Sequence, residues 1–193
     1  MTEKIHHDKY YVLTSENPDM MLLYTLPKPT EKREDRWLKG SPFKNPLKHD
    51  PVIATIQPGN EHDQLMPYFD EPPVMSNEFY QALVEAGVDN LDAYDCILRS
   101  EDGTVEYKGF KAVNIIGVIR ATGEGTEFTG ESRLIDAGMD KLSIDSNKTF
   151  GALMFRLAEN LSTVVVHERV KRYIEQKGFP SIVFREPEET LVL

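Results

Sequence analysis

The residues of this sequence that could do chemistry are mainly carboxylates, accompanied by five histidines and one cysteine. Glu61, His62 and Asp63 are adjacent and have the residue types of a general acid–base cluster. A solvated loop of this composition is several times commoner than a catalytic cluster, so we expect a solvated loop at residues 61–63. The histidines show no paired metal-ligand spacing, and Cys96 has no cysteine neighbour. The sequence therefore predicts no metal site.

Gly123, Gly125 and Gly130 do not match the dinucleotide-binding fingerprint. Glu124 and Glu127 stand between them and would repel a pyrophosphate. The chain also lacks a P-loop lysine and a Gly-x-Ser-x-Gly elbow. We therefore predict no cofactor, no catalytic residue and no enzyme activity. The open alternative is a small hydrolase or transferase, because the many carboxylates could include an unrecognised catalytic pair.

The charge of the chain is unevenly distributed. The net charge is −10, and residues 61–145 hold 18 acidic and 6 basic side chains, a net −12. A nucleic-acid binder normally has the opposite sign, so we expect no nucleic-acid partner. This charge either keeps the protein soluble or attracts a basic protein partner. The candidate contacts for such a partner lie in two predicted loops and one predicted strand: Asp89, Asp92, Asp95, Glu101, Asp102, Glu124, Glu127 and Glu131.

The length of 193 residues fits one domain, and the 40% apolar and 28% charged residues are typical of soluble globular proteins. No apolar run approaches the roughly 20 residues that span a bilayer, and the start of the chain resembles no secretory signal. Together with a single cysteine, this favours a cytoplasmic protein with no membrane partner. We expect residues 1–8 to be disordered. We expect residues 27–51 to form an ordered proline-rich arm, because Trp37 and Phe43 are rarely found in disordered segments.

Residues 163–186 predict a strand, an amphipathic helix and a second strand. The helix should span residues 168–177, with its apolar face at Val170, Tyr173 and Ile174 and its end at Gly178. Residues 74–88 repeat this pattern, with a helix near residues 77–86 that Ser76 caps. Any amphipathic helix closed by glycine looks similar, so an internal repeat is one of two interpretations. We assign His167 as a helix cap or a surface residue.

The remaining pattern is mostly strand-like. The predicted strands are residues 9–13, 20–26, 52–56, 91–98, 105–121, 133–135, 141–144 and 182–184, with an Asp-Gly turn at residues 100–104 and a bulge or bend at Gly117. Residues 150–161 fit either a helix or a strand, and their composition favours a strand. The tail after Phe184 could fray or pack on a sheet. The predicted fold class is α+β, a single domain with a mixed or antiparallel sheet and at least two amphipathic helices.

Several stretches of the chain resemble the bacterial immunity proteins of polymorphic toxin systems, in the family numbered eleven among them. The tryptophan-glycine-proline element of the family is matched by residues 37–43 (WLKGSPF). Its central helix and following strand are matched by residues 75–79 (MSNEF), Leu83, residues 86–88 and Tyr94. Its C-terminal signature is matched by residues 153–159 (LMFRLAE), residues 165–171 (VVHERVK) and Gly178-Phe179. It covers about residues 37–185. At His167 the chain departs from the family, which often has serine there.

The resemblance implies a cytosolic protein that binds and neutralises a cognate toxin by stoichiometric association. It assigns no functional residue, because the toxin-facing surface of such proteins varies with the toxin. A basic toxin domain, such as a nuclease that binds phosphates, would suit the acidic centre of this chain. The acidic residues named above are then the candidate toxin contacts. A scaffold or assembly module without a toxin partner is the third hypothesis.

Overall fold

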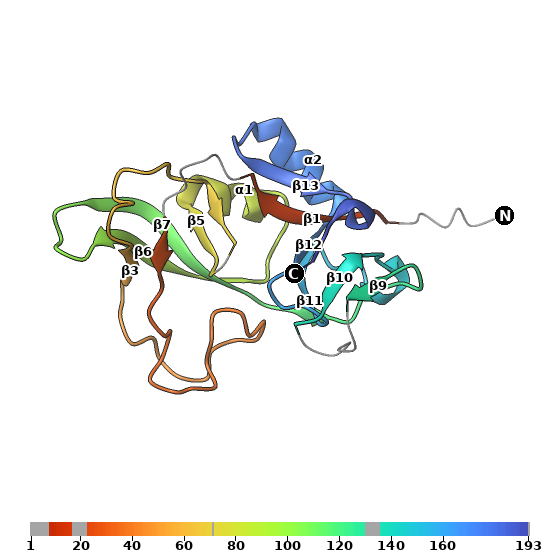
Figure 1. Cartoon of the computed structure of the whole chain (residues 1–193), viewed down its shortest axis with the longest axis horizontal. Helices are drawn as coiled ribbons and strands as arrows, with labels where there is room; N and C mark the ends of the chain where they lie inside the picture. Colours follow the sequence, from red (N-terminus) through yellow and green to blue (C-terminus); the bar gives the residue numbers. More distant parts are fainter. Residues whose placement is uncertain (1–7, 17–22, 71, 130–135, 193) are drawn as a thin grey trace.

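The computed structural model describes residues 8–16, 23–70, 72–129 and 136–192, and these form an α+β domain with mixed sheets (Figure 1). The predicted fold class is confirmed. The described part contains two α-helices and two short 3-10 turns: α1 (Asn77–Glu85), α2 (Glu168–Lys177), η1 (Ser146–Lys148) and η2 (Pro187–Glu189). The predicted disordered start lies outside the described residues except for Asp8, which is exposed.

Six of the described strands make one mixed sheet. Its centre is the long antiparallel hairpin of β6 and β7, and β3 lies parallel to β6. In β3, Val52, Ala54 and Ile56 are buried and the residues between them are more exposed, as expected for a strand with one packed face. In spatial order the strands are β2 (Tyr24–Thr25), β3 (Val52–Ile56), β6 (Leu91–Ser100), β7 (Glu106–Ile115), β5 (Val74–Ser76) and β4 (Tyr68–Phe69).

A second sheet of five described strands lies beside the first, and a two-stranded sheet packs near it (Figure 1). The five-stranded sheet is antiparallel except for the parallel pair of β11 and β8. Its order is β13 (Ile182–Arg185), β1 (Tyr10–Ser15), β12 (Val164–His167), β11 (Met154–Leu157) and β8 (Val118–Ile119). The two-stranded sheet pairs β9 (Glu127–Thr129) with β10 (Gly138–Lys141).

The two predicted strand–helix–strand units share one topology. Strands β5 and β6 flank β7, and both run antiparallel to it. Strands β12 and β13 flank β1 in the same way. In each unit the helix therefore connects two parallel-directed strands across one antiparallel strand, a split β-α-β arrangement. This common topology supports the interpretation of residues 74–88 and 163–186 as an internal repeat.

Both helices begin at the predicted caps. The hydroxyl of Ser76 accepts a hydrogen bond from the amide of Phe79 at 3.2 Å. His167 caps α2 in the same manner, because its Nδ1 accepts from the amide of Arg169 at 3.0 Å. The imidazole thus replaces the hydroxyl of the common cap residues. Gly178 ends α2 at a φ of 72°, as predicted.

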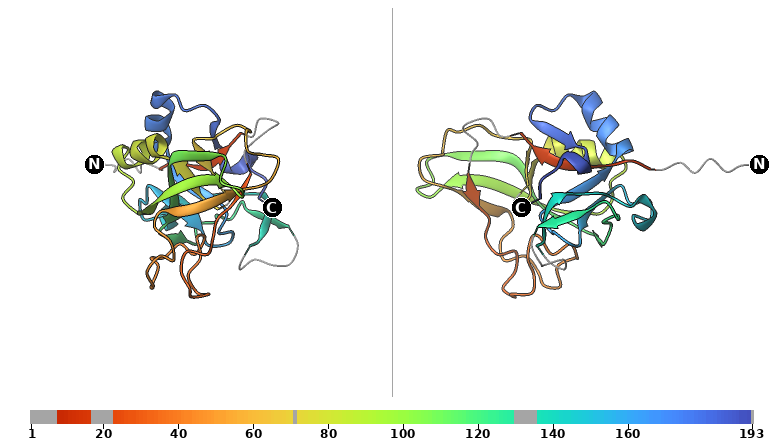
Figure 2. Two further views of the ribbon diagram at one scale, coloured as in Figure 1. Left: turned by 90° about the vertical axis from the view of Figure 1, so that its left-hand side faces the viewer. Right: turned by 45° about the vertical axis from the view of Figure 1, so that its right-hand side comes forward.

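The helices pack against each other and against both sheets. Tyr173 and Lys177 of α2 reach Glu85 of α1, with hydrogen bonds of 2.7 and 2.9 Å. Beneath them, Phe79 and Ile174 enter a shared core with residues of both sheets. Both views of Figure 2 show the helices on the upper side of the molecule and residues 27–51 on the lower side. The two sheets and two helices are therefore one packed body.

The predicted long strand at residues 105–121 is two strands in two different sheets. β7 ends at Ile115, and β8 resumes at Val118 beside β11. Gly117 between them has a φ of 112°, which an L side chain rarely adopts. The predicted bend is confirmed, but the prediction of one continuous strand was wrong. The apolar run is buried up to Ile115, whereas Val118 of β8 is 41% exposed.

Other predictions were correct in type and shifted in bounds. The strand predicted at residues 141–144 lies earlier, as β10, and the segment 150–161 contains a strand only at β11. Phe150, taken as the start of that run, is exposed instead. The tail packs, since Val192 pairs with Met139. The prediction for residues 133–135 lies outside the described residues, and of residues 20–26 only β2 is described as a strand.

The arm at residues 27–51 packs on the six-stranded sheet. Trp37 is 6% exposed, and its Nε1 donates to the carbonyl of Pro27 at 2.8 Å. Its ring meets those of Phe43 and Tyr94 edge to face, at centroid distances of 5.3 and 6.0 Å. Aromatic pairs in this geometry add to the free energy gained by burial. The sequence prediction that Trp37 and Phe43 pack against the body is confirmed.

Replacing Trp37 with Ala should lower the free energy of unfolding by about 3–5 kcal/mol, because the ring is buried and its removal leaves a cavity. Urea unfolding followed by circular dichroism measures this change. Trp37→Phe, the matched control, keeps most of the packing and loses the bond to Pro27, so we expect a cost of about 1–3 kcal/mol. An unchanged midpoint in Trp37→Ala would contradict a stabilising role for the arm.

Candidate functional site

The two acidic residues of the β6–β7 hairpin turn differ in role. The carboxylate of Asp102 accepts hydrogen bonds from the Ser100 hydroxyl at 2.7 Å and from the Thr104 amide at 3.0 Å. The first of these is the main cause that lowers the pKa of Asp102 to about 2. Glu101 beside it is exposed. One of the two predicted contacts in this turn therefore builds the turn, and the other faces solvent.

The acids at and before β6 divide in the same way. Asp95 lies 2.6 Å from the ammonium group of Lys111 on β7, so its charge is already paired. Asp92 is half-buried opposite Asn114, and Asp89 is exposed just before the strand. Adjacent positions of a strand point to opposite faces, so acids three apart do not share one face. This strand presents no continuous acidic face.

The acidic turn before β9 is firmly held. The amide of Gly123 donates to the carbonyl of Ser143 at 2.7 Å. The Thr126 hydroxyl donates to the same carbonyl at 3.1 Å and accepts from the amide of Ser143 at 3.1 Å. Glu124 and Glu127 project from this turn and are exposed. Glu131, the third predicted acid of this stretch, lies outside the described residues. The turn therefore presents at least two acids on an ordered backbone.

The structure does not bring the two predicted acidic loops together. The hairpin tip after β6 and the turn before β9 lie at opposite ends of the longest axis (Figure 1). The two predicted acidic loops therefore do not form one surface, because β6 and β7 carry the hairpin away from the second sheet.

At the end of the molecule that carries β9, acids from the N- and C-terminal parts of the chain join the turn. Asp8, Glu186 and Glu188 line a cavity of about 200 Å³, which is also lined by Ile144. Ile144 pairs with Thr122 at the base of the acidic turn. We call the following residues the acidic end: Asp8, Glu124, Glu127, Asp145, Glu186 and Glu188. Lys9, Lys141 and Lys148 offset part of their charge.

Sequence reasoning missed four of the six residues of the acidic end: Asp8, Asp145, Glu186 and Glu188. The terminal segments, residues 1–60 and 146–193, each have a net charge of +1, so their acids did not stand out in a count by segment. The pairing of β1 with β12 and β13 brings both segments to one place. The only local signal was the acidic tail after Phe184. A surface of this kind is assembled by the tertiary structure.

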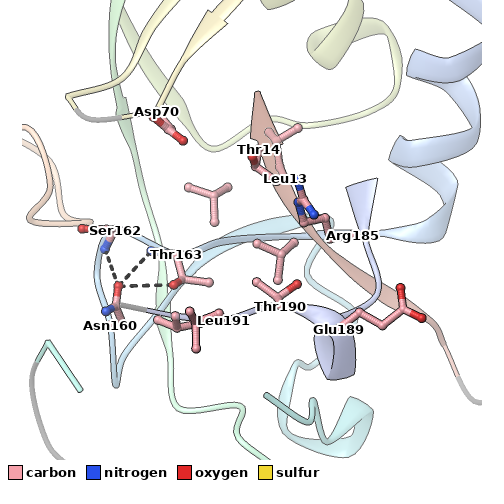
Figure 3. A pocket seen from close by; sticks show the side chains of 13 residues that line it. Leu13, Thr14, Asp70, Asn160, Ser162, Thr163, Arg185, Glu189, Thr190 and Leu191 are labelled. Carbon is pink, nitrogen blue, oxygen red and sulfur yellow. Dashed lines mark hydrogen bonds between the residues drawn. The ribbon is translucent and has the colours of Figure 1, made fainter. Parts of the chain in front are cut away.

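A cleft with a partly polar lining lies between β1, the end of β11 and the C-terminal tail (Figure 3). Its volume is about 380 Å³. Asn160 there accepts hydrogen bonds through Oδ1 from Ser162 and Thr163. Asp70 and Glu189 are exposed and lie on opposite sides of the cleft in Figure 3. The cleft therefore lacks a pair of buried carboxylates, which the hydrolase or transferase hypothesis requires.

Two acids buried elsewhere do not form such a pair either. Asp35 lies in the arm, where its side chain is 0% exposed. Glu159 follows β11, and its carboxylate accepts from the Thr122 hydroxyl at 2.9 Å and lies 3.9 Å from Arg120. At residues 61–63, Glu61 accepts from the amide of Gly59, and His62 is exposed. This agrees with the predicted loop rather than an acid–base cluster.

Among the described residues, no three of histidine, cysteine, aspartate and glutamate lie close enough together to hold a metal ion. The described helices are also too short or too polar to cross a membrane. No family model matches this chain, and no curated protein matches it either. The resemblance to the immunity proteins therefore stays a prediction.

Asp35 makes the arm sensitive to acid. The hydrogen bond from Asn45 at 2.9 Å is the largest cause that lowers the pKa of Asp35 to about 2, and bonds from Lys44 and Thr30 add to it. Because the folded pKa is depressed from 3.8, this stabilisation is complete above the unfolded pKa. It is lost as the pH falls toward 2.

We expect Asp35→Asn to loosen the arm at neutral pH, and the stability difference from wild type to vanish between about pH 4 and 2. Trp37 is the only tryptophan, so its fluorescence reports the arm. Glu34→Gln, an exposed neighbour, is the matched control and should not change the profile. A stability difference that persists unchanged at pH 2 would contradict this account of Asp35.

Proposed function

We propose that this chain is a cytoplasmic immunity protein, which binds a basic toxin domain through the acidic end and neutralises it by stoichiometric association. The observation that carries the proposal is the assembly of acids from three separate chain segments around one ordered turn. Of these acids, Glu124 lies exposed on a backbone held by Ser143. Complementary potentials of this kind raise association rates and select partners of opposite charge.

The partner's chemistry follows from the same surface. A nuclease must hold phosphates with lysine and arginine side chains, and this basic surface is what an acidic inhibitor can cover. Inhibitor and nucleic acid would then compete for one site on the toxin. In this proposal the toxin is encoded next to the gene for this chain, directly upstream and as the end of a large secreted protein.

Reversing Glu124, Glu127 and Glu131 to Lys should leave the fold intact and lower the association rate with the purified toxin domain by about tenfold at low salt. The difference should shrink as ionic strength rises, because exposed charges are screened. Stopped-flow or surface plasmon resonance at several salt concentrations measures both effects.

The matched control reverses three exposed acids outside the acidic end: Glu34, Asp89 and Glu101. It makes the same change in net charge, so it separates local from overall electrostatics. Equal rates in the two triple variants would show that only net charge matters. A toxin domain that does not bind the wild-type chain would contradict the proposed function itself.

A further inference from the structure

Phe150 is the most exposed of the large apolar side chains in the described part, at 91%, and the next is Leu191 at 59%. Its backbone has a φ of 55°, in the left-handed region. Bulky side chains are rare outliers there, because Cβ approaches the carbonyl oxygen. The fold therefore keeps an aromatic ring in water at a position where Gly or Asn would be better tolerated. Neither burial nor local conformational preference explains a phenylalanine here.

The turn that carries Phe150 is held from beneath. Thr149 is fully buried, and its hydroxyl lies 2.7 Å from the hydroxyl of Tyr10 and 2.8 Å from the carbonyl of Ser146. On the C-terminal side of Phe150, the amide of Ala152 donates to the carbonyl of Thr149 at 3.0 Å. These bonds fix the backbone on both sides of Phe150. The ring is presented on an ordered base, which lowers the entropy lost when a partner binds it.

Phe150 belongs to the same end of the molecule as the acidic turn. The ammonium group of Lys148 donates to the carbonyl of Thr122 at 2.8 Å, and the amide of Asp145 donates to the carbonyl of Ala121 at 2.9 Å. Glu124 is two residues beyond Thr122, and Phe150 is two residues beyond Lys148. An exposed aromatic thus stands beside the acidic end, in the pattern of an apolar anchor with a charged rim.

We propose that Phe150 is the apolar anchor of the partner-binding surface, and that its ring enters a hydrophobic pocket with a basic rim on the protein partner. This inference rests on the proposed function and adds the residue that holds the complex together. The acids act before contact, through long-range attraction, and so they control the association rate. The ring acts after contact, by leaving water, and so it controls the dissociation rate.

The test replaces Phe150 with Asn, which is polar and tolerates a positive φ. The probe is the purified toxin domain encoded by the upstream gene, with binding followed by surface plasmon resonance at low and high salt. We expect the dissociation rate to rise at least tenfold at both salt concentrations, with little change in the association rate. Without the toxin domain, the thermal midpoint of the Phe150→Asn variant should equal or exceed that of wild type, because Asn relieves the backbone strain at the positive φ.

Val84→Gln is the matched control, since Val84 is 40% exposed and lies on α1. It removes exposed apolar surface from a helix without touching the Phe150 turn, and its binding should stay at the wild-type level. A Phe150→Asn variant that dissociates as slowly as wild type would overturn the inference and leave the proposed function standing. If the probe does not bind wild type at all, the proposed function fails and this inference fails with it.

A second copy of this chain is the other occupant that the ring could accept. Sedimentation of wild type and Phe150→Asn over a range of concentrations distinguishes it. A wild-type dimer that Phe150→Asn converts to a monomer would overturn the partner pocket in favour of self-association. Wild type that remains monomeric, together with faster dissociation of the variant from the toxin domain, supports the inference.

Discussion

The close approach of the arm, the β7–β8 connection and β11 is the contact on which the rest of this fold depends. The amide of Gly117 donates to the carbonyl of Gly40 at 2.8 Å, and the amide of Arg156 donates to the carbonyl of Gly117 at 2.9 Å. A Cβ on Gly40 would lie 2.2 Å from a methyl group of Val118. Three chain segments meet here, Gly40 has no room for a side chain, and at this point the chain passes from one sheet to the other.

This junction explains why distant parts of the chain behave as one body. Asn90 donates to the carbonyls of Ile116 and Met154, so it joins the end of β7 to the start of β11. Asn114 donates to the carbonyl of Ser41 at 2.9 Å and fixes the arm to β7. Hydrogen bonds of this kind stabilise one arrangement, because breaking them leaves a polar group unpaired away from water. The two split β-α-β units are then held at a defined relative position.

The acidic end benefits from this rigidity. Its acids come from segments that are far apart in the chain, and they share a surface only because β1 lies between β12 and β13. The acidic turn itself is bonded to Ser143, and the turn of Phe150 is bonded to Tyr10. A surface preorganised in this way loses little conformational entropy on binding. Charge and exposed aromatic area are therefore available together on a fixed frame.

Local patterns were sufficient to predict the helices, their caps and most strand centres. Ser76 and Gly178 act through neighbours within four residues, so their roles could be read from the chain. The burial of Trp37 was also predictable, since a large aromatic ring is costly to leave in water. The α+β class followed from these elements.

Tertiary structure alone decided which elements share a sheet and which acids share a surface. The change of sheet at Gly117 depends on contacts with Gly40 and Arg156, which lie tens of residues away in the chain. The separation of Glu101 from Glu124 follows from the length and direction of the β6–β7 hairpin, and the convergence of Asp8 and Glu186 follows from strand order. Local sequence encodes the preferences of single segments, whereas these outcomes depend on packing between segments that are distant along the chain.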